Sequence, residues 1–439
     1  MAKPLVAIIG RPNVGKSTFF NRMAGRRIAI VEDYPGVTRD RLYADVEWLN
    51  HQFTLIDTGG IEMSSDDELW SMMRMQAQLA VETADVILFF VDGRAGLVKS
   101  DEDVAEYLRK SSKPVVVAVN KIDTPDNPDT FYDFYSLGMG DLYPISAEQG
   151  LGLGDLLDAV AAHFPPPNEL DADSSSISIA VVGKPNAGKS SLVNALLKKE
   201  RSIVSDIPGT TRDAIDTPFE WEGGNYVIID TAGMRKQSKI AFDSLEKFSV
   251  LRALTAIRRC DVAVIVTDAE AGITEQDQRI AGFVKDEGKA AIILANKWDT
   301  IEKDTYTIEK YRKDIYSRLE FISYAPILFI SAKTGQRVDK VMGMVKEVYK
   351  NATTRITTGT LNECINEAVV VTEPPSSSGR RLKIYYATQV STQPPTFALF
   401  VNDKELMHYS YERYIENYLR KTFNFEGTPI RLLMRERKD

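Results

Sequence analysis

Cysteine is scarce in this sequence. The only two cysteines among its 439 residues, Cys260 and Cys364, are far apart in the chain. This spacing excludes a metal site built from closely spaced cysteines. Cys260 also lies beside the apolar run Val262–Val266. We therefore expect two reduced, structural thiols rather than a disulfide, which fits a cytoplasmic location.

Apolar runs long enough to cross a membrane are also missing. The longest runs, such as Val86–Val91 and Val115–Val119, have the length of strands, whereas a membrane helix needs about 20 apolar residues. The first four residues lead directly into an apolar run and leave no room for a signal peptide. We expect a protein without a membrane span or a signal peptide.

The chain has no excess of positive charge. Its 54 Lys and Arg face 62 Asp and Glu, a net charge of −8, which argues against indiscriminate binding to nucleic acids. Residues 351–439 differ, with 12 − 10 = +2, so the remainder carries −8 − 2 = −10. Basic residues of this region could meet phosphates: Arg380, Arg381, Lys383, Arg431, Arg435, Arg437 and Lys438. Tyrosines near them could stack on bases, although we expect most of them to fill a small core: Tyr385, Tyr386, Tyr409, Tyr411, Tyr414 and Tyr418.

The sequence does contain one glycine-rich pattern written twice. Gly-x-x-x-x-Gly-Lys-Ser follows the apolar run Leu5–Ile9 and again the run Ile177–Val182, and helix-forming residues come after each copy. The copies are 183 − 10 = 173 residues apart. A strand, this loop and a helix in that order predict a phosphate-binding P-loop. The residues concerned are Gly10, Arg11, Pro12, Asn13, Val14, Gly15, Lys16 and Ser17, and then Gly183, Lys184, Pro185, Asn186, Ala187, Gly188, Lys189 and Ser190.

The residue types of the P-loop have chemical reasons. Glycines let backbone N–H groups approach phosphate oxygens. Lys16 and Lys189 are expected to reach the β- and γ-phosphates, and Ser17 and Ser190 to ligate Mg²⁺.

A second repeated pattern, Asn-Lys-x-Asp, predicts a guanine site. Its residues are Asn120, Lys121 and Asp123, and then Asn296, Lys297 and Asp299, at an offset of 296 − 120 = 176. The carboxylate can accept hydrogen bonds from two N–H donors of guanine that adenine does not offer together, so the wrong base would leave it unpaired. The asparagines can bond the base and tie this loop to the P-loop, and the lysine stems can cover the base plane. The turns Ser146, Ala147 and Ser331, Ala332, Lys333 would present backbone N–H groups to the guanine carbonyl.

A third repeat faces the γ-phosphate. Asp57, Thr58, Gly59 and Gly60 follow the run Phe53–Ile56, and Asp230, Thr231, Ala232 and Gly233 follow Tyr226–Ile229, at 230 − 57 = 173. We expect the aspartates to hold Mg²⁺ through water and Gly60 and Gly233 to sense the γ-phosphate by their N–H groups. Thr38 and Thr211 lie in the preceding loops and could equally be plain turn residues.

In order and spacing, these motifs resemble those of small GTP-binding proteins. The resemblance implies that Thr38 and Thr211 are switch threonines that close on Mg²⁺ only with a triphosphate. A repeat of this length indicates a duplicated domain rather than a solenoid.

One catalytic residue of Ras-like proteins is missing. Those proteins carry a Gln after Asp-x-x-Gly to orient the attacking water, but Ile61 and Met234 stand here. Either both domains bind without turnover, or another group orients the water. The Pro-Asn-x-Gly-Lys-Ser pattern is similar to that of potassium-activated GTPases, which implies that Asn13 and Asn186 help to bind K⁺. The alternative is that each Asn only caps its loop.

Essentially the whole chain resembles the tandem-GTPase ribosome assembly factors called Der or EngA. The strongest elements are GRPNVGKS, PGVTRD, DTGG and NKID, followed by GKPNAGKS, PGTTRD, DTAG and NKWD. The resemblance implies GTP and GDP binding and GTP hydrolysis, with Lys16, Thr38, Gly60, Lys189, Thr211 and Gly233 as catalytic residues. It also implies action in assembly of the large ribosomal subunit, with that subunit and its rRNA as partners. We expect a monomer.

The domain order follows from the repeats. Strands alternate with helices in each repeat, which predicts an α/β domain with a mainly parallel sheet and helices on both faces. We expect a first GTPase domain at 1–165, a Pro- and Ser-rich linker at 166–176, a second GTPase domain at 177–350 and a C-terminal domain at 351–439.

The C-terminal region follows a different pattern. Predicted helices and strands in the order α-β-β-α-β indicate a small α+β domain, and the resemblance implies a KH-like one. They are Leu361–Val371, Arg381–Val390, Thr396–Val401, Tyr409–Phe425 and Ile430–Arg435, after a last GTPase-domain helix at Val338–Lys350. The G-x-x-G loop of KH domains is missing, which puts direct RNA binding by such a loop in doubt.

Two other functions remain open at this point. The first is a GTP-sensing scaffold whose turnover is incidental, because Ile61 and Met234 cannot orient water. The second is a GTPase of tRNA modification, since those enzymes share the P-loop pattern. They usually carry a cofactor domain or a terminal catalytic Cys, and this chain has neither.

Overall fold

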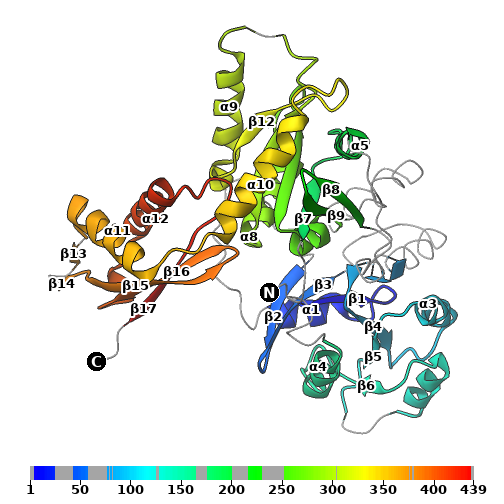
Figure 1. Ribbon diagram of the computed structural model, residues 1–439. Coiled ribbons are helices and arrows are strands. Elements are labelled where there is room, and N and C mark those ends of the chain that lie inside the picture. Colours follow the sequence, from blue (N-terminus) through cyan, green and yellow to red (C-terminus); the bar gives the residue numbers. More distant parts are fainter. Residues whose placement is uncertain are drawn as a thin grey trace. The chain divides into compact units, whose positions relative to one another are not determined.

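The computed structural model describes most of the chain, in two compact units (Figure 1). The described residues are 4–24, 43–57, 77–78, 80–81, 83–124, 128–164, 176–199, 216–229, 252–302, 304–374, 376–377 and 380–436. The first unit contains those up to 164 and the second those from 176 on. Most of the predicted linker therefore lies outside the described residues. No helix within the described ranges is long and apolar enough to cross a membrane.

The first unit is built around a six-stranded sheet in the order β2-β3-β1-β4-β5-β6. Neighbouring strands are parallel, except that β2 runs antiparallel to β3. The elements are β1 (Leu5–Ile9), α1 (Lys16–Ala24), β2 (Tyr43–Trp48), β3 (His51–Asp57), β4 (Val86–Asp92), α3 (Lys99–Arg109), β5 (Val115–Asn120), the 3₁₀ helix η1 (Asp129–Leu137), β6 (Leu142–Pro144) and α4 (Leu153–Ala162).

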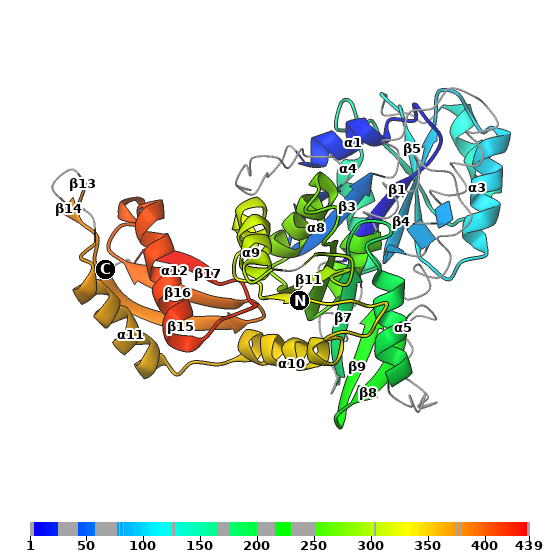
Figure 2. The ribbon, with the colours of Figure 1, turned by 90° about the horizontal axis from the view of Figure 1, so that it is seen from above.

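Helices cover both faces of this sheet, because its central strands β1 and β4 are apolar except for Asp92 at the end of β4. All residues of β1 and β4 are buried. Helices α1 and α4 share one core with Val6 and Ile8 of β1, and Figure 2 shows α3 on the opposite side of the strands. The carboxyl ends of β1, β3, β4 and β5 therefore meet at one edge, where the predicted motifs begin.

The second unit begins with the same topology. Its sheet has the order β8-β9-β7-β10-β11-β12, and only β8 is antiparallel to its neighbour. The elements are β7 (Ser176–Val182), α5 (Lys189–Lys199), β8 (Thr217–Trp221), β9 (Gly224–Ile229), β10 (Val262–Asp268), α8 (Glu275–Asp286), β11 (Ala290–Asn296), α9 (Thr307–Arg318), the 3₁₀ helix η2 (Glu320–Ile322), β12 (Ile327–Phe329) and α10 (Asp339–Thr353).

Alternate residues of the central strands face two different cores. Ala263 and Ile265 of β10 pack with α8 and α9, while Val264 and Val266 pack with α5 and α10. This is the period of two expected when both faces of a strand are buried. The two predicted α/β domains, each with a mainly parallel sheet and helices on both faces, are therefore confirmed.

The C-terminal domain lies in the same unit and has one three-stranded sheet. Strands β15 and β16 are antiparallel, and β16 and β17 are parallel. The elements are α11 (Thr358–Val371), β13 (Ser376–Ser377), β14 (Arg380–Arg381), β15 (Ile384–Thr392), β16 (Pro395–Val401), the 3₁₀ helix η3 (Lys404–Leu406), α12 (Tyr409–Phe423) and β17 (Arg431–Glu436). Helices α11 and α12 share one core with the sheet. The predicted α-β-β-α-β order is present, with the short β13–β14 hairpin as an addition.

The expectation for the tyrosines is met only in part. Tyr411 is buried, and Tyr414 and Tyr418 pack against the core. Tyr385, Tyr386 and Tyr409 are exposed by 50%, 43% and 59%. Half of the six, rather than most, fill the core. The two strand tyrosines lie where β15 has an irregular register between Ile384 and Tyr386.

Both cysteines are free and buried, as expected for structural thiols. Burial raises the pKa of Cys260 to about 12, so this thiol stays protonated and unreactive at neutral pH.

The C-terminal domain docks on the second GTPase domain through the segment between α12 and β17. The N–H of Ala291, in β11, donates to the carbonyl of Gly427 at 2.7 Å, and the N–H of Gly427 donates to the carbonyl of Tyr324 at 2.8 Å. Gly427 has a φ of +78°, and a Cβ placed on it would lie 2.3 Å from a side-chain carbon of Val348 in α10. Only glycine fits this contact without strain.

Candidate functional site

The first P-loop connects β1 to α1 and folds around its own lysine. Lys16 Nζ donates hydrogen bonds to the carbonyls of Gly10 at 2.6 Å and Arg11 at 2.7 Å. An ammonium group has three N–H donors, so one remains for another acceptor. The loop thus holds a cationic donor close to the start of a helix, where an anion is favoured.

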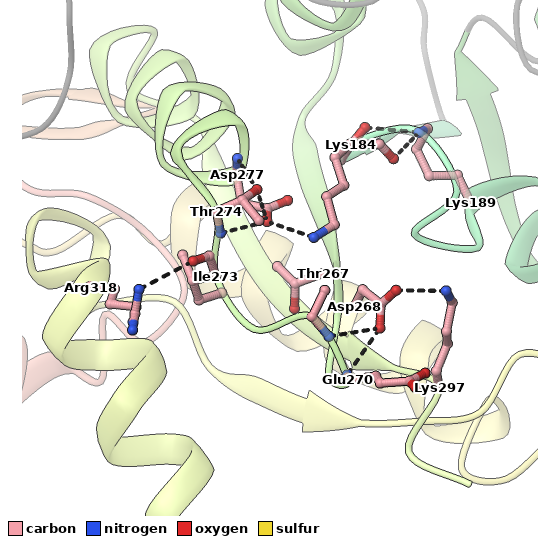
Figure 3. Close-up of polar contacts among 12 residues, drawn as sticks. Lys184, Lys189, Thr267, Asp268, Glu270, Ile273, Thr274, Asp277, Lys297 and Arg318 are labelled. Carbon is pink, nitrogen blue, oxygen red and sulfur yellow. Dashed lines mark hydrogen bonds and ion pairs between the residues drawn. The ribbon is translucent and has the colours of Figure 1, made fainter. Parts of the chain in front are cut away.

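The second P-loop has the same geometry between β7 and α5. Lys189 Nζ donates to the carbonyls of Gly183 at 2.8 Å and Lys184 at 2.7 Å, and Figure 3 shows the lysine curled over its loop. Burial lowers the pKa of Lys16 and of Lys189 to about 8. Burial therefore disfavours the positive charge of each lysine, and a bound anion would stabilise that charge.

The base motif is tied to the P-loop in both domains. Asn120 Nδ2 donates to the carbonyl of Val14 at 2.6 Å, and Asn296 Nδ2 donates to that of Ala187 at 2.8 Å. A Cβ on Gly15 or Gly188 would lie 2.1 Å from the amide nitrogen of the neighbouring asparagine. The second glycine of each P-loop is thus required by this close approach.

The turns that follow β6 and β12 bond the amide oxygen of each asparagine. The N–H of Ala147 donates to Asn120 Oδ1 at 2.9 Å, and the N–H of Ala332 donates to Asn296 Oδ1 at 2.9 Å. We expected these turns to direct N–H groups at the base. In the structure these two N–H groups hold the asparagines, whose amide oxygens would otherwise be buried without a donor.

The aspartate of the first base motif is held by its surroundings. Asp123 Oδ1 accepts a hydrogen bond from Ser146 Oγ at 2.6 Å, and Arg94 forms an ion pair with Oδ2. The hydrogen bond from Ser146 holds the pKa of Asp123 below its usual value. The carboxylate is therefore ionised at neutral pH and can accept hydrogen bonds from N–H donors.

The lysines of the base motifs lie on aspartates at the ends of β4 and β10. Lys121 Nζ is 2.7 Å from Asp92 Oδ2, and Lys297 Nζ is 2.6 Å from Asp268 Oδ2, as Figure 3 shows. Both lysines have a left-handed backbone, with φ of +70° and +62°. Each ammonium group is thereby fixed while the alkyl stem spans the edge of the site.

In the second domain these elements line one pocket of about 500 Å³. It contains residues of the P-loop, the base motif and the turn after β12: Asn186, Gly188, Lys189, Ser190, Ser191, Asn296, Lys297, Asp299, Thr300, Ser331, Ala332 and Lys333. This volume is within the usual range for a small-molecule site.

Two of the predicted Mg²⁺ ligands meet in the first domain. Ser17 Oγ donates to Asp57 Oδ2 at 3.0 Å, and Asp57 is buried at the end of β3. A hydroxyl and a carboxylate at this distance are oxygen donors of the type that Mg²⁺ takes beside substrate phosphates. The two side chains therefore fit such an ion.

The potassium candidates have a distinctive backbone. Asn13 and Asn186 have φ of +64° and +62°, and both are exposed.

Several predicted site residues lie outside the described residues. They are Thr38, Thr58, Gly59 and Gly60 in the first domain and Thr211, Asp230, Thr231, Ala232 and Gly233 in the second, together with Ile61 and Met234.

A further repeated motif of the site was not predicted from the sequence. Asp92, Gly96 and Asp101 share the pattern Asp-x-x-x-Gly-x-x-x-x-Asp with Asp268, Gly272 and Asp277, at 268 − 92 = 176 and 277 − 101 = 176. This is the offset of the two Asn-Lys-x-Asp motifs, so a search for self-similarity could have found it.

Comparisons with known proteins agree with this architecture. Residues 5–121 and 178–297 match the family model described as 50S ribosome-binding GTPase. Residues 355–435 match the model for the KH-domain-like C-terminal region of EngA bacterial GTPase enzymes.

Curated relatives match from end to end. GTPase Der of Acetivibrio thermocellus is 58% identical over 439 residues, covering 100% of both chains. GTPase Der of Alkaliphilus metalliredigens is 59% identical over 437 residues, covering 100% of this chain and 99% of the relative. The chain has two P-loops that are each bonded to a base motif, and it matches these relatives over its whole length at 58% and 59% identity. It therefore belongs to the Der family of tandem GTPases, which bind GTP and GDP.

Proposed function

We propose that this GTPase needs Mg²⁺, is stimulated by K⁺, and acts as a nucleotide-dependent switch in assembly of the large ribosomal subunit. The observation that carries the proposal is that two complete phosphate and base motifs are each joined by a buried asparagine. The duplication gives the chain two sites that can hold different nucleotides.

Guanine selection falls to Asp123 and Asp299. The carboxylate of Asp123 is ionised and partly enclosed, so a base without two matching donors leaves it short of hydrogen bonds. The two lysines of the base motifs, held at Asp92 and Asp268, cover the base with their stems.

Phosphate binding falls to the P-loops. Lys16 and Lys189 would use the third donor of each ammonium group for a phosphate oxygen, which gives each buried cation a partner of opposite charge. Ser17 with Asp57, and Ser190 with Asp230, would hold Mg²⁺, which neutralises charge on the β- and γ-phosphates. Thr38 and Thr211 would close on the triphosphate state, and Gly60 and Gly233 would donate N–H groups to the γ-phosphate.

Water activation must work without a Gln at positions 61 and 234. Asn13 and Asn186 would help to hold K⁺, which would supply positive charge toward the negative charge of the transition state. The alternative is a GTP-sensing scaffold with incidental turnover, which Ile61 and Met234 favour.

The ribosomal role is supported by the family model described as 50S ribosome-binding GTPase and by the KH-like C-terminal domain. Arg380, Arg381 and Lys383 are exposed on that domain, where they could meet phosphates of rRNA. We propose that the protein works as a cytoplasmic monomer on this partner.

Steady-state phosphate release in matched K⁺ and Na⁺ buffers tests the enzymatic part. We expect hydrolysis to require Mg²⁺ and to run on the order of a hundredfold faster in K⁺, because one oriented charge commonly contributes that much. Asn13→Ala and Asn186→Ala, made separately, assign the effect to a site. Equal rates in the two salts would remove the potassium claim, and negligible turnover in both would favour the scaffold.

A further inference from the structure

The segments that follow β4 and β10 each join the two halves of a nucleotide site. We call Asp92–Asp101 and Asp268–Asp277 the bridging segments. The first aspartate of each contacts the lysine of the base motif, as described above. The second aspartate lies at the third residue of α3 or α8 and faces the P-loop.

These second aspartates are fully buried. Asp101 and Asp277 are both 0% exposed. Arg11 Nε lies 3.4 Å from Asp101 Oδ1, and Lys184 Nζ lies 3.7 Å from Asp277 Oδ2. Arg11 and Lys184 occupy the same P-loop position, since 184 − 11 = 173. Each repeat therefore pairs a buried carboxylate with the second residue of its P-loop.

That second residue also positions the P-loop lysine. The carbonyl of Arg11 accepts a hydrogen bond from Lys16 Nζ at 2.7 Å, and the carbonyl of Lys184 accepts one from Lys189 Nζ at 2.7 Å. Figure 3 shows this chain of contacts in the second domain, from Asp277 through Lys184 to Lys189. The peptide that carries the charged side chain is the peptide that orients the lysine.

We propose that Asp101 and Asp277 are positioning residues for nucleotide binding, each fixing the first half of its P-loop through the charged second residue. The inference rests on the proposed nucleotide sites. With their first aspartates on Lys121 and Lys297, the bridging segments set the distance between the phosphate and base halves of each site.

Helix capping is the competing explanation, and the two repeats separate it from the proposal. In the second repeat Asp277 does cap: its Oδ2 accepts hydrogen bonds from Thr274 Oγ1 at 2.7 Å and Thr274 N at 3.0 Å. In the first repeat the equivalent residue is Val98, since 274 − 98 = 176, and it provides no hydroxyl.

Asp101 is nevertheless present and buried. Neither of its oxygens has a donor with normal hydrogen-bond geometry among the described residues. Burial raises the pKa of Asp101 to about 6, while the Arg11 guanidinium and the Val98 N–H favour the charged form. A buried carboxylate needs a charged partner, and in both repeats the described partner of opposite charge is the second residue of the P-loop.

Release of a fluorescent GDP analogue from the full-length protein, followed by stopped flow, tests the proposal. Lys16→Ala in every variant weakens the first site, so that the second site is observed. In this background we compare Asp277→Asn, Lys184→Met, the double variant and Thr274→Val. The last reproduces Val98: it removes the hydroxyl bonds of the cap and keeps the backbone N–H of residue 274 that bonds Asp277.

We expect Asp277→Asn and Lys184→Met each to speed release on the order of tenfold, because both free the same loop. The double variant should release no faster than either single variant, since the two residues act through one contact. Thr274→Val should lower the thermal midpoint and leave release within about twofold, because it keeps the ion pair.

The proposal would be overturned if Asp277→Asn released the GDP analogue within about twofold of the parent's rate. It would also be overturned if the double variant's rate increase were the product of the two single increases. If Asp277→Asn does not fold, the same comparison with Asp101→Asn and Arg11→Met in a Lys189→Ala background decides it. Failure of the parent to bind the GDP analogue would contradict the proposed function instead, so the two outcomes are distinct.

Discussion

At the scale of single residues, each nucleotide site depends on a few buried polar groups with defined partners. Asn120 and Asn296 use both the donor and the acceptor of their amides inside the protein. Asp123 keeps a negative charge because Ser146 donates to it. Lys16 and Lys189 are buried cations whose charge is only partly compensated. These features give two predictions.

The preference for guanine should depend on the carboxylate of the aspartate in each base motif. Asp123→Asn and Asp299→Asn replace an acceptor by a donor, so each should weaken GDP binding at its own site by on the order of a hundredfold or more. Xanthine nucleotides should bind better in exchange, because xanthine presents a carbonyl where guanine has its amine. Calorimetric titration with GDP, XDP and ADP checks this. Tight ADP binding by the unmodified protein would show that these aspartates do not select the base.

Nucleotide binding should take up protons above neutral pH. Burial lowers the pKa of Lys16 and Lys189 to about 8, and a phosphate beside each ammonium group raises it again. The complex then holds more protons than the free protein above pH 8, so affinity falls as pH rises through 8. Below about pH 7 both forms are charged and this dependence is absent.

Calorimetry in buffers of different ionisation enthalpy measures that uptake. We expect about three quarters of a proton per site at pH 8.5 and about a tenth at pH 7. The same uptake at both pH values would contradict the role given to these lysines.

At the scale of elements, the duplicated sheet brings the motifs together. Parallel strands place all their carboxyl ends at one edge, so motifs that are far apart in sequence meet there. The strands and P-loops could be predicted from sequence because their signals are local: an apolar run of strand length, then a glycine-rich turn, then helix formers. Leu5–Ile9 is predicted and observed with the same bounds.

Other features could not be predicted, because they depend on contacts between distant segments. In the sequence, Asp101 resembles any acidic residue in the first turn of a helix. Only the structure shows that it is buried beside Arg11. The docking segment around Gly427 reads as an ordinary turn. Its role comes from Ala291 and Tyr324, more than 100 residues earlier in the chain.

This docking contact should be sensitive to a single methyl group. Gly427→Ala adds a Cβ 2.3 Å from a carbon of Val348 at a φ of +78°, so we expect a loss of ~1–3 kcal/mol in the stability of the second unit. The matched control is Gly343→Ala in α10, the helix that carries Val348, where a Cβ meets nothing within 4 Å. It should stabilise the helix by ~0.5–1 kcal/mol. Thermal unfolding by calorimetry compares them, and equal effects of the two substitutions would disprove the fit described for Gly427.

At the scale of the whole molecule, one strand connects a nucleotide site to the C-terminal domain. The first residues of β11 include Ala291, which bonds Gly427, and its last residue is Asn296, which bonds the second P-loop. A fully buried strand thus carries the docking contact near one end and the base motif at the other. Nucleotide can bias the arrangement of domains only through different affinities for different arrangements, and the switch threonines Thr38 and Thr211 are the residues that we expect to distinguish triphosphate from diphosphate.

The measurement that tests the switch most directly is co-sedimentation of the full-length protein with large ribosomal subunits, in GDP and in a non-hydrolysable GTP analogue. We expect stronger pelleting with the GTP analogue. We also expect that Arg380→Glu with Lys383→Glu weakens this pelleting while GTP hydrolysis in the absence of ribosomes is kept. Identical pelleting with the two nucleotides would contradict the claim that the nucleotide state controls binding to the large subunit.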